Sequence, residues 1–203
     1  MNEFESLCLQ LSSRLCERSV AEANTALPQA AVALVLRRSF ETPELLVIKR
    51  AVHERDHWSG HLALPGGRRD RADADLRQTA IRETLEEVGI DLASGGQVLG
   101  PLETIGPRSP QAPQIAVTPF VAVAPAQYNL SPARPEPLEL SLNQEVAAAF
   151  WVPVNWLKKN GRSEIFRFIV NGKEREWPSY PTPEGPIWGL TERVITNFLS
   201  LIE

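Results

Sequence analysis

The segment from residue 65 to residue 89 constrains the fold most strongly, because the sharpest turn signal of the sequence stands just before its clearest helix. The Pro-Gly-Gly triplet at the start of this segment ends a short extended piece and predicts a tight turn. Residues 75–88 predict a helix, with Asp75 as its N-cap and Gly89 just past its end. We therefore expect a turn that leads into a helix with well-marked ends.

Three acidic residues gather on one side of this helix. An α-helix turns by about 100° per residue, so Glu87 lies about 40° to one side of Glu83 and Glu86 about 60° to the other. The opposite side is aliphatic, and we expect it to face the core. Its residues are Ile81, Leu85 and Val88.

Three carboxylates in the last turns of a helix repel one another and oppose the helix dipole. A hard divalent cation reverses this cost, because it prefers carboxylate oxygens and keeps waters that a phosphate can replace. The alternative is a solvated acidic face that Arg77 and Arg82 balance. The glycines of the turn favour the interpretation as a cation site over the solvated face, since they let the backbone approach an ion closely. Arg82 lies beside Glu86, where it can orient a carboxylate or bind a phosphate.

The same residues form a pattern that resembles the Nudix box, the signature of hydrolases of nucleoside diphosphates linked to another moiety. The matching run is Gly67-x5-Asp73-x8-Arg82-Glu83-x2-Glu86-Glu87-x-Gly89-Ile90. Asp73 stands where the family has its first glutamate, the spacer after it is one residue longer, and Thr84 replaces a hydrophobic residue. The resemblance covers about residues 28–203. It implies an α/β (α+β) fold, a Nudix-type α/β/α sandwich with a mixed β-sheet.

The longer spacer and the aspartates of the turn are similar to the coenzyme A pyrophosphohydrolase branch of this family. Residues 45–50 match an upstream motif of that branch, whereas residues 58–61 match only in part, since His61 stands where glutamine is expected. The resemblance implies cleavage of coenzyme A or acyl-coenzyme A to 3′,5′-ADP and a 4′-phosphopantetheine product. Hydrolysis of ADP-ribose, NDP-sugars or other nucleoside diphosphates is the alternative. A non-catalytic Nudix-fold binding module is a third reading, which the three retained acids disfavour.

The resemblance also implies a metal site. Glu83 and Glu87 would be the main ligands of Mg²⁺ or Mn²⁺, with Glu86 and the carbonyl of Gly67 completing the set. Two or more cations would neutralise the diphosphate and activate water.

The remaining catalytic roles are less constrained. Glu145, at the end of a proline-rich loop, is a candidate general base, and Glu83 is the alternative. Arg82 belongs to the expected catalytic group as an orienting cation, whereas Asp73 is expected to brace the turn.

Cationic and aromatic residues provide candidates for substrate binding. Arg50, Arg68, Arg69 and His61 are the substrate-binding candidates, and solvated surface side chains are the alternative. His57 is expected to be structural. A tryptophan could stack on an adenine, although Trp151 and Trp188 fit the core better. The five tryptophans are Trp58, Trp151, Trp156, Trp177 and Trp188.

The rest of the chain predicts one domain with interspersed strands and helices. We expect residues 1–27 to form an N-terminal helical extension packed on a Nudix hydrolase domain at 28–203. Helices are predicted over residues 3–19 and after Gly189, and an irregular loop at about 125–144. Strands are predicted at residues 30–36, 45–49, 61–64, 97–103, 115–124 and 147–152.

Composition excludes several other classes of protein. The net charge of −4 argues against sequence-independent nucleic-acid binding, and no apolar run approaches the ~20 residues of a membrane span. Two cysteines give no disulfide framework, and the first residues show no basic leader, so a cytoplasmic protein is expected. The expected partner is a small-molecule nucleoside diphosphate substrate; a homodimer stays open.

Overall fold

The computed structural model describes residues 3–15, 27–40, 42–52, 59–106, 114–136, 138–170 and 173–202. The predictions for residues 16–19, for His57 and for Trp58 lie outside these residues. In chain order the elements are α1 (Glu3–Leu15), β1 (Gln29–Arg37), β2 (Glu44–Arg50), β3 (Leu62–Ala63), β4 (Gly66–Arg68), α2 (Leu76–Val88), β5 (Gln97–Pro101), β6 (Ala116–Val123), a 3₁₀ turn (Ala126–Tyr128), β7 (Val146–Pro153), α3 (Val154–Asn160), β8 (Glu164–Val170), β9 (Lys173–Tyr180), β10 (Ile187–Trp188) and α4 (Gly189–Leu199).

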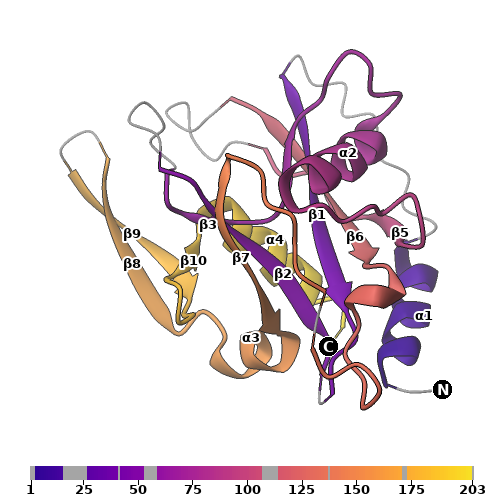
Figure 1. Ribbon diagram of the computed structural model, residues 1–203. Helices are drawn as coiled ribbons and strands as arrows, with labels where there is room; N and C mark the ends of the chain where they lie inside the picture. Colours follow the sequence, from indigo (N-terminus) through magenta and orange to yellow (C-terminus); the bar gives the residue numbers. More distant parts are fainter. Residues whose placement is uncertain are drawn as a thin grey trace.

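A mixed β-sheet forms the centre of the fold (Figure 1). Its strand order is β3-β2-β1-β6-β5, with β4 also paired to β1 and β7 to β2. β1 and β2 are antiparallel, with Leu36 opposite Leu45, as the hairpin-like pattern predicts. β1 and β6 are parallel, so the chain must cross over between them, and α2 lies in this connection. The predicted α/β class and mixed sheet are therefore confirmed.

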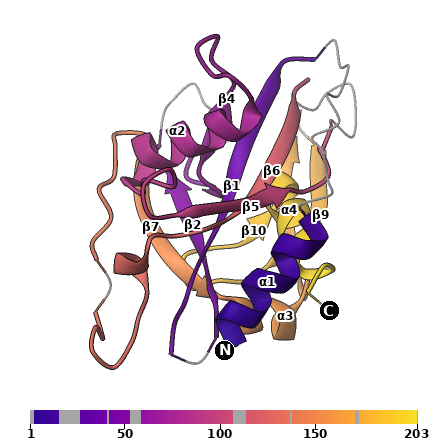
Figure 2. The same cartoon turned by 90° about the vertical axis from the view of Figure 1, so that its right-hand side faces the viewer.

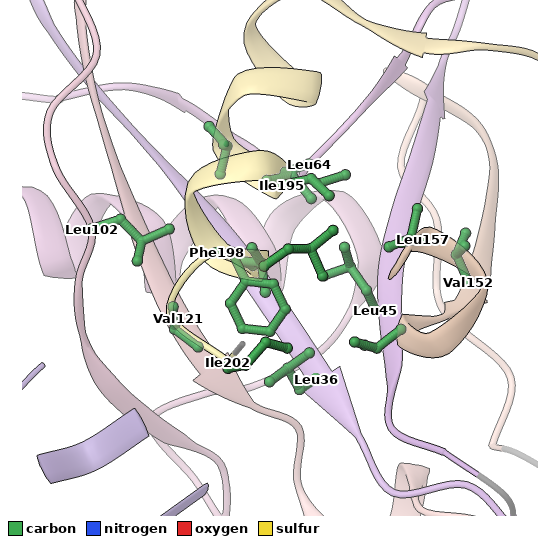
Figure 3. Close-up of a cluster of buried hydrophobic side chains, with 14 of the residues drawn as sticks. Leu36, Leu45, Leu64, Leu102, Val121, Val152, Leu157, Ile195, Phe198 and Ile202 are labelled. Atoms are coloured by element: carbon green, nitrogen blue, oxygen red, sulfur yellow. The ribbon is translucent and has the colours of Figure 1, made fainter. Parts of the chain in front are cut away.

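The two faces of β1 bury different layers, because successive side chains of a strand point to opposite sides. Leu34 and Leu36 lie in one core cluster with Phe198 of α4, and Figure 3 shows Phe198 between the sheet and its helix. Ala33 and Val35 lie in the other cluster, with α2. The alanine leaves room for the helix backbone, and this close packing fixes where the acids of α2 lie.

A second, three-stranded sheet of order β10-β9-β8 stands beside the central sheet (Figure 1). β8 and β9 form a hairpin in which Phe166 lies opposite Trp177. Neither this hairpin nor the short helix α3 follows from the local sequence patterns. The final helix was predicted, and Val194, Ile195 and other residues of its apolar face are buried.

Helix α1 packs against the core beside β5 (Figure 2). Leu11 and Leu15 are fully buried in the same cluster as α4. Gly100 of β5 makes this contact possible, since a Cβ there would lie 2.7 Å from Cβ of Leu15. The division at residues 27 and 28 stays a prediction. In the described part of the chain, no helix combines the length and apolarity that crossing a membrane requires.

Helix α2 has the predicted ends but a different buried face. Asp75 caps it by accepting from the Gln78 amide at 2.7 Å, and Gly89 adopts a left-handed conformation with φ of 73°. The prediction that Leu85 faces the core is wrong, because its side chain is 46% exposed. Thr84 and Glu87 are buried in its place. The helix is therefore rotated so that one acid of the cluster points inward.

Candidate active site

The glycine turn brings backbone directly against the acids of α2. Gly66 donates its amide to Oε2 of Glu87 at 2.9 Å. A Cβ on Gly67 would lie only 2.5 Å from Oε1 of Glu83. β4 is held in place by pairing with β1, where Gly67 lies opposite Ala31. The carboxylates of Glu83 and Glu87 therefore both lie against the backbone of the glycine turn.

Burial shapes the electrostatics of this pair. The pKa of Glu87 rises to about 7, mainly because burial disfavours its charged form, and the charge of Glu83 adds to the rise. Arg50 opposes this rise through its positive charge. Burial also raises the pKa of Glu83. Buried carboxylates that repel each other are a donor set that a hard cation would stabilise.

Arg82 ties the acidic cluster to the turn. Its Nε and Nη2 both bind the Asp73 carboxylate at 3.0 Å, and its Nη1 lies 2.8 Å from Glu83 and 3.0 Å from Glu86. Nη2 also donates to the Arg68 carbonyl at 3.2 Å. These five contacts equal the five N–H donors of a guanidinium. Of its two suggested roles, the structure therefore supports orientation of carboxylates rather than phosphate binding.

Asp73 braces the turn, as predicted. Its carboxylate also accepts hydrogen bonds from the Asp70 amide at 2.9 Å and from Thr79 Oγ1 at 2.8 Å. The hydrogen bonds from Arg82 hold the pKa of this buried carboxyl well below its usual range. Asp73 is thus fully engaged within the protein.

The irregular loop before β7 packs on the C-terminal end of α2. Ser141 and Asn143 donate their amides to the carbonyls of Val88 and Glu87, each at 3.2 Å. These bonds occupy carbonyls that the end of a helix leaves free. Asn143 also accepts from the Glu145 amide at 2.8 Å. Glu145 is exposed at the loop's end, within electrostatic range of Glu83 and Glu87.

A cleft of about 590 Å³ lies between β3, β4, β10 and the start of α4. Three of the four predicted substrate-binding residues line it, namely Arg50, His61 and Arg68. Arg69 does not, because it donates to the carbonyls of Asp73 and Ala74 and to Gln29. Arg50 also lines a neighbouring hollow with Glu145, and its positive charge acts on Glu87 of the acidic cluster.

A comparison with protein families decides the assignment: the model of the NUDIX domain matches residues 27–171, more than half of the chain. The chain belongs to the Nudix family. An uncharacterised Nudix hydrolase NudL of Pectobacterium atrosepticum is 32% identical over 157 residues, which are 76% of this chain and 72% of that protein. An uncharacterised protein of Schizosaccharomyces pombe is 34% identical over 163 residues, 72% of this chain but only 47% of its own length. The NUDIX domain of Shewanella oneidensis NrtR, solved with ADP ribose, has the same fold, with a TM-score of 0.55, 15% identity and full coverage of both chains.

The prediction of a Nudix hydrolase is therefore confirmed. Enzymes of this kind act on nucleoside diphosphate derivatives and use divalent metal ions. Within the described residues, no group of three or more aspartate, glutamate, histidine or cysteine side chains lies close enough together to hold a metal ion as they stand. The donor chemistry nevertheless fits a hard cation: Glu83 and Glu87 are oxygen donors, and the space beside Gly67 is one that a Cβ would fill.

The lining of the cleft also includes Arg193, which was not among the predicted site residues of this Nudix protein. Trp177, one of the tryptophans that could stack on an adenine, lines the cleft as well, together with Trp188, which was expected in the core. Trp188 is indeed buried, at 6% exposure, and its ring contacts those of His61, Phe166 and Trp177. Trp188 and Arg193 lie at and after β10, so their position beside Arg50 depends on the second sheet, which local sequence signals did not indicate.

Proposed function

We propose that this Nudix hydrolase cleaves the diphosphate of coenzyme A or its acyl derivatives, giving 3′,5′-ADP and (acyl-)4′-phosphopantetheine. The observation that carries the proposal is the place of Arg50, which lines a cleft rich in arginine and aromatic side chains and whose charge acts on Glu87 of the acidic cluster. The sequence motif at residues 45–50 supports the coenzyme A assignment. Hydrolysis of ADP-ribose, NDP-sugars or other nucleoside diphosphates is the second candidate, since the acidic cluster suits any diphosphate.

In this proposal Glu83 and Glu87 hold Mg²⁺ or Mn²⁺, with Glu86 and the Gly67 carbonyl as additional donors. The bound ions would supply charge neutralisation of the diphosphate and a more acidic water. Arg82 acts by holding Glu83 and Glu86 in place through its two Nη1 contacts.

The reaction forms a bond from a water oxygen to one phosphorus and breaks the bond from that phosphorus to the bridging oxygen, which leaves on the second phosphate. Glu145 or Glu83 accepts the proton of the water. Glu145 has the exposed position that a base needs to reach solvent, whereas Glu83 lies closer to the turn. Arg50 and Arg68 bind the phosphate oxygens, since both line the cleft beside the acids.

The test is a substrate panel with Mg²⁺ or Mn²⁺, containing coenzyme A, acetyl-coenzyme A, ADP-ribose, NADH, an NDP-sugar and 8-oxo-dGTP, with separation of products. Coenzyme A should be cut fastest. Rapid cleavage of ADP-ribose or the NDP-sugar with coenzyme A left intact would refute the branch assignment and favour the second candidate.

Variants test the site itself. Glu83→Gln and Glu87→Gln should each lower turnover by roughly three orders of magnitude or more while keeping the fold, because they remove donors rather than core contacts. Glu103→Gln, at an exposed position outside the cluster, is the control. Manganese binding, followed by the electron paramagnetic resonance of free Mn²⁺, should weaken in both variants. Unchanged turnover in Glu87→Gln would refute the role of Glu87 as a metal ligand, and a wild-type protein inert towards the whole panel would point to the non-catalytic module.

A further inference from the structure

The hairpin of β8 and β9 extends away from the central sheet (Figure 1). Its base is buried, since Ser179 and Tyr180 are 0% and 3% exposed, whereas residues 174–176 further along β9 are all exposed. A two-stranded hairpin is marginally stable in water by itself, because it buries too little apolar surface. The outer part of this hairpin would therefore be stabilised by a further strand.

β8 is the edge strand of its sheet. Among the strands that the structure describes, β9 is the one that pairs with β8, in the order β10-β9-β8. An edge strand directs one row of backbone N–H and C=O groups away from the sheet, where another strand can pair with them. Ile165 and Ile169 of β8 are 53% and 68% exposed, and they lie on the same face because side chains alternate along a strand. The edge of β8 thus offers both backbone groups and apolar side chains to an additional strand.

The opposite face of the hairpin already packs on the rest of the protein. Phe166 of β8 lies opposite Trp177 of β9. The rings of these two residues lie 4.7 Å and 5.2 Å from that of Trp188, which is buried and lines the cleft. A strand added to β8 would meet its outer edge and the side chains of Ile165 and Ile169, so it would leave the rings beside the cleft in place.

The sequence of β8 indicates what this additional strand is. Residues 165–169 read Ile-Phe-Arg-Phe-Ile, which is the same in both directions around Arg167. Two copies of such a strand, antiparallel about a twofold axis at Arg167, place each of these residues opposite one of the same type. Ile165 of one copy then lies opposite Ile169 of the other, and cross-strand pairs of β-branched side chains stabilise a sheet. The edge of β8 is thus complementary to a second copy of itself.

The charged residue at the centre of this pattern has its counter-ion within the same copy. Nε and Nη2 of Arg167 both lie 2.9 Å from Oε1 of Glu176 on β9. Like charges directly opposite each other oppose the pairing of two strands. In the paired arrangement, however, each arginine keeps its glutamate on the outer side, so the row across the two hairpins reads acid, arginine, arginine, acid. The charges of this row balance, and the four isoleucines lie on either side of it.

We propose that two copies of this protein form a symmetric dimer in which their β8 strands pair antiparallel, centred on Arg167, and join the two three-stranded sheets into one. Such an interface uses the same surface on both copies, so it closes after two and covers both β8 edges. A strand of 7 residues gives a small interface, and we expect a dissociation constant in the micromolar range. The dimer does not depend on the proposed function, because none of these contacts involves the acidic cluster or a substrate.

Sedimentation velocity at protein concentrations from about 1 to about 200 µM tests for the dimer, because this range spans the expected dissociation constant. The mass should rise from the 22.5 kDa of one chain towards twice that value. Ile169→Lys should weaken dimerisation at least tenfold, since a lysine on an edge strand opposes pairing with another edge. Leu9→Lys is the matched control, because Leu9 is 61% exposed but lies on α1. A wild-type protein that stays monomeric throughout would overturn the proposal, and so would an Ile169→Lys protein that dimerises as tightly as wild type.

Cysteine cross-linking tests the register of the two strands. Opposite residues of an antiparallel pair have Cα atoms within reach of a disulfide, whereas position 165 of one copy lies about 13 Å along the strand from position 165 of the other. A mixture of Ile165→Cys and Ile169→Cys should therefore form a covalent dimer on mild oxidation, and either variant alone should not. Wild type treated alike is the control for the native Cys8 and Cys16. Cross-linking of the mixture no greater than that of the single variants would overturn the proposed pairing.

Discussion

Replacing each of the two neighbouring glycines of the turn by alanine should have different effects: one substitution should lower activity and the other should lower stability. At Gly67 the new Cβ would lie 2.5 Å from Oε1 of Glu83, so the carboxylate must move by nearly 1 Å to reach an ordinary contact of about 3.4 Å. Glu83 is a flexible side chain, so this movement should leave the fold intact. Misplacing a reacting group by about 1 Å costs on the order of a hundredfold in rate. Gly67→Ala should therefore lower kcat by roughly a hundredfold.

Gly66→Ala provides the contrast. Its Cβ would lie 2.3 Å from the carbonyl oxygen of Ala31 on β1, and its φ of 152° is one that L-residues rarely adopt. Backbone strain and overpacking together should destabilise the protein by about 3 kcal/mol or more. Urea denaturation followed by circular dichroism, beside turnover of the best substrate, separates the two variants. A Gly67→Ala protein with wild-type turnover and wild-type stability would refute the placement of Glu83 against the turn.

Two further predictions concern α2 and the brace of the turn. Leu85→Ala should lower the free energy of unfolding by about 0.5 kcal/mol or less, because Leu85 is largely exposed. Val88→Ala should lower it by about 2 kcal/mol, because Val88 is buried. Equal urea midpoints for the two variants would contradict the observed rotation of the helix. Asp73→Asn should destabilise the protein at pH 7. Because the folded pKa of Asp73 is depressed, its contribution is complete above the ordinary value of 3.8 and is lost as the pH falls through the lower folded value. The gap between the urea midpoints of Asp73→Asn and wild type should thus narrow progressively as the pH falls below about 4, and a gap at pH 2 as large as that at pH 7 would argue against this account.

Local signals predicted the parts of the fold that local chemistry controls. Asp75 and Gly89 mark the ends of α2 because a cap residue and a left-handed glycine satisfy the helix ends whatever packs on them. The β1–β2 pair follows from two apolar runs separated by a polar connection. The acids of the box are adjacent in sequence and on one helix, so their proximity needed no knowledge of the tertiary structure.

Features that depend on distant partners were missed. Leu85 was expected in the core from helical periodicity alone, but the bond from the Gly66 amide and the packing on β1 bury Glu87 instead. The β8–β9 hairpin has exposed residues such as Ile165 where an alternating pattern would require polar ones, so its sequence did not indicate strands. Arg193 meets the cleft only because α4 returns to the central sheet.

The contacts of Arg82 bear on which positively charged residues can bind the phosphates of a substrate. A guanidinium whose donors already contact Asp73, Glu83, Glu86 and the turn has none left for a phosphate unless the acids are released. Releasing Asp73 would leave a buried carboxylate without its counter-ion, which costs several kcal/mol. Substrate phosphates must therefore be met by arginines outside the box, and the cleft offers Arg50, Arg68 and Arg193. In the proposed function, the box therefore holds the acids in place, and we expect residues from separate elements to bind the substrate.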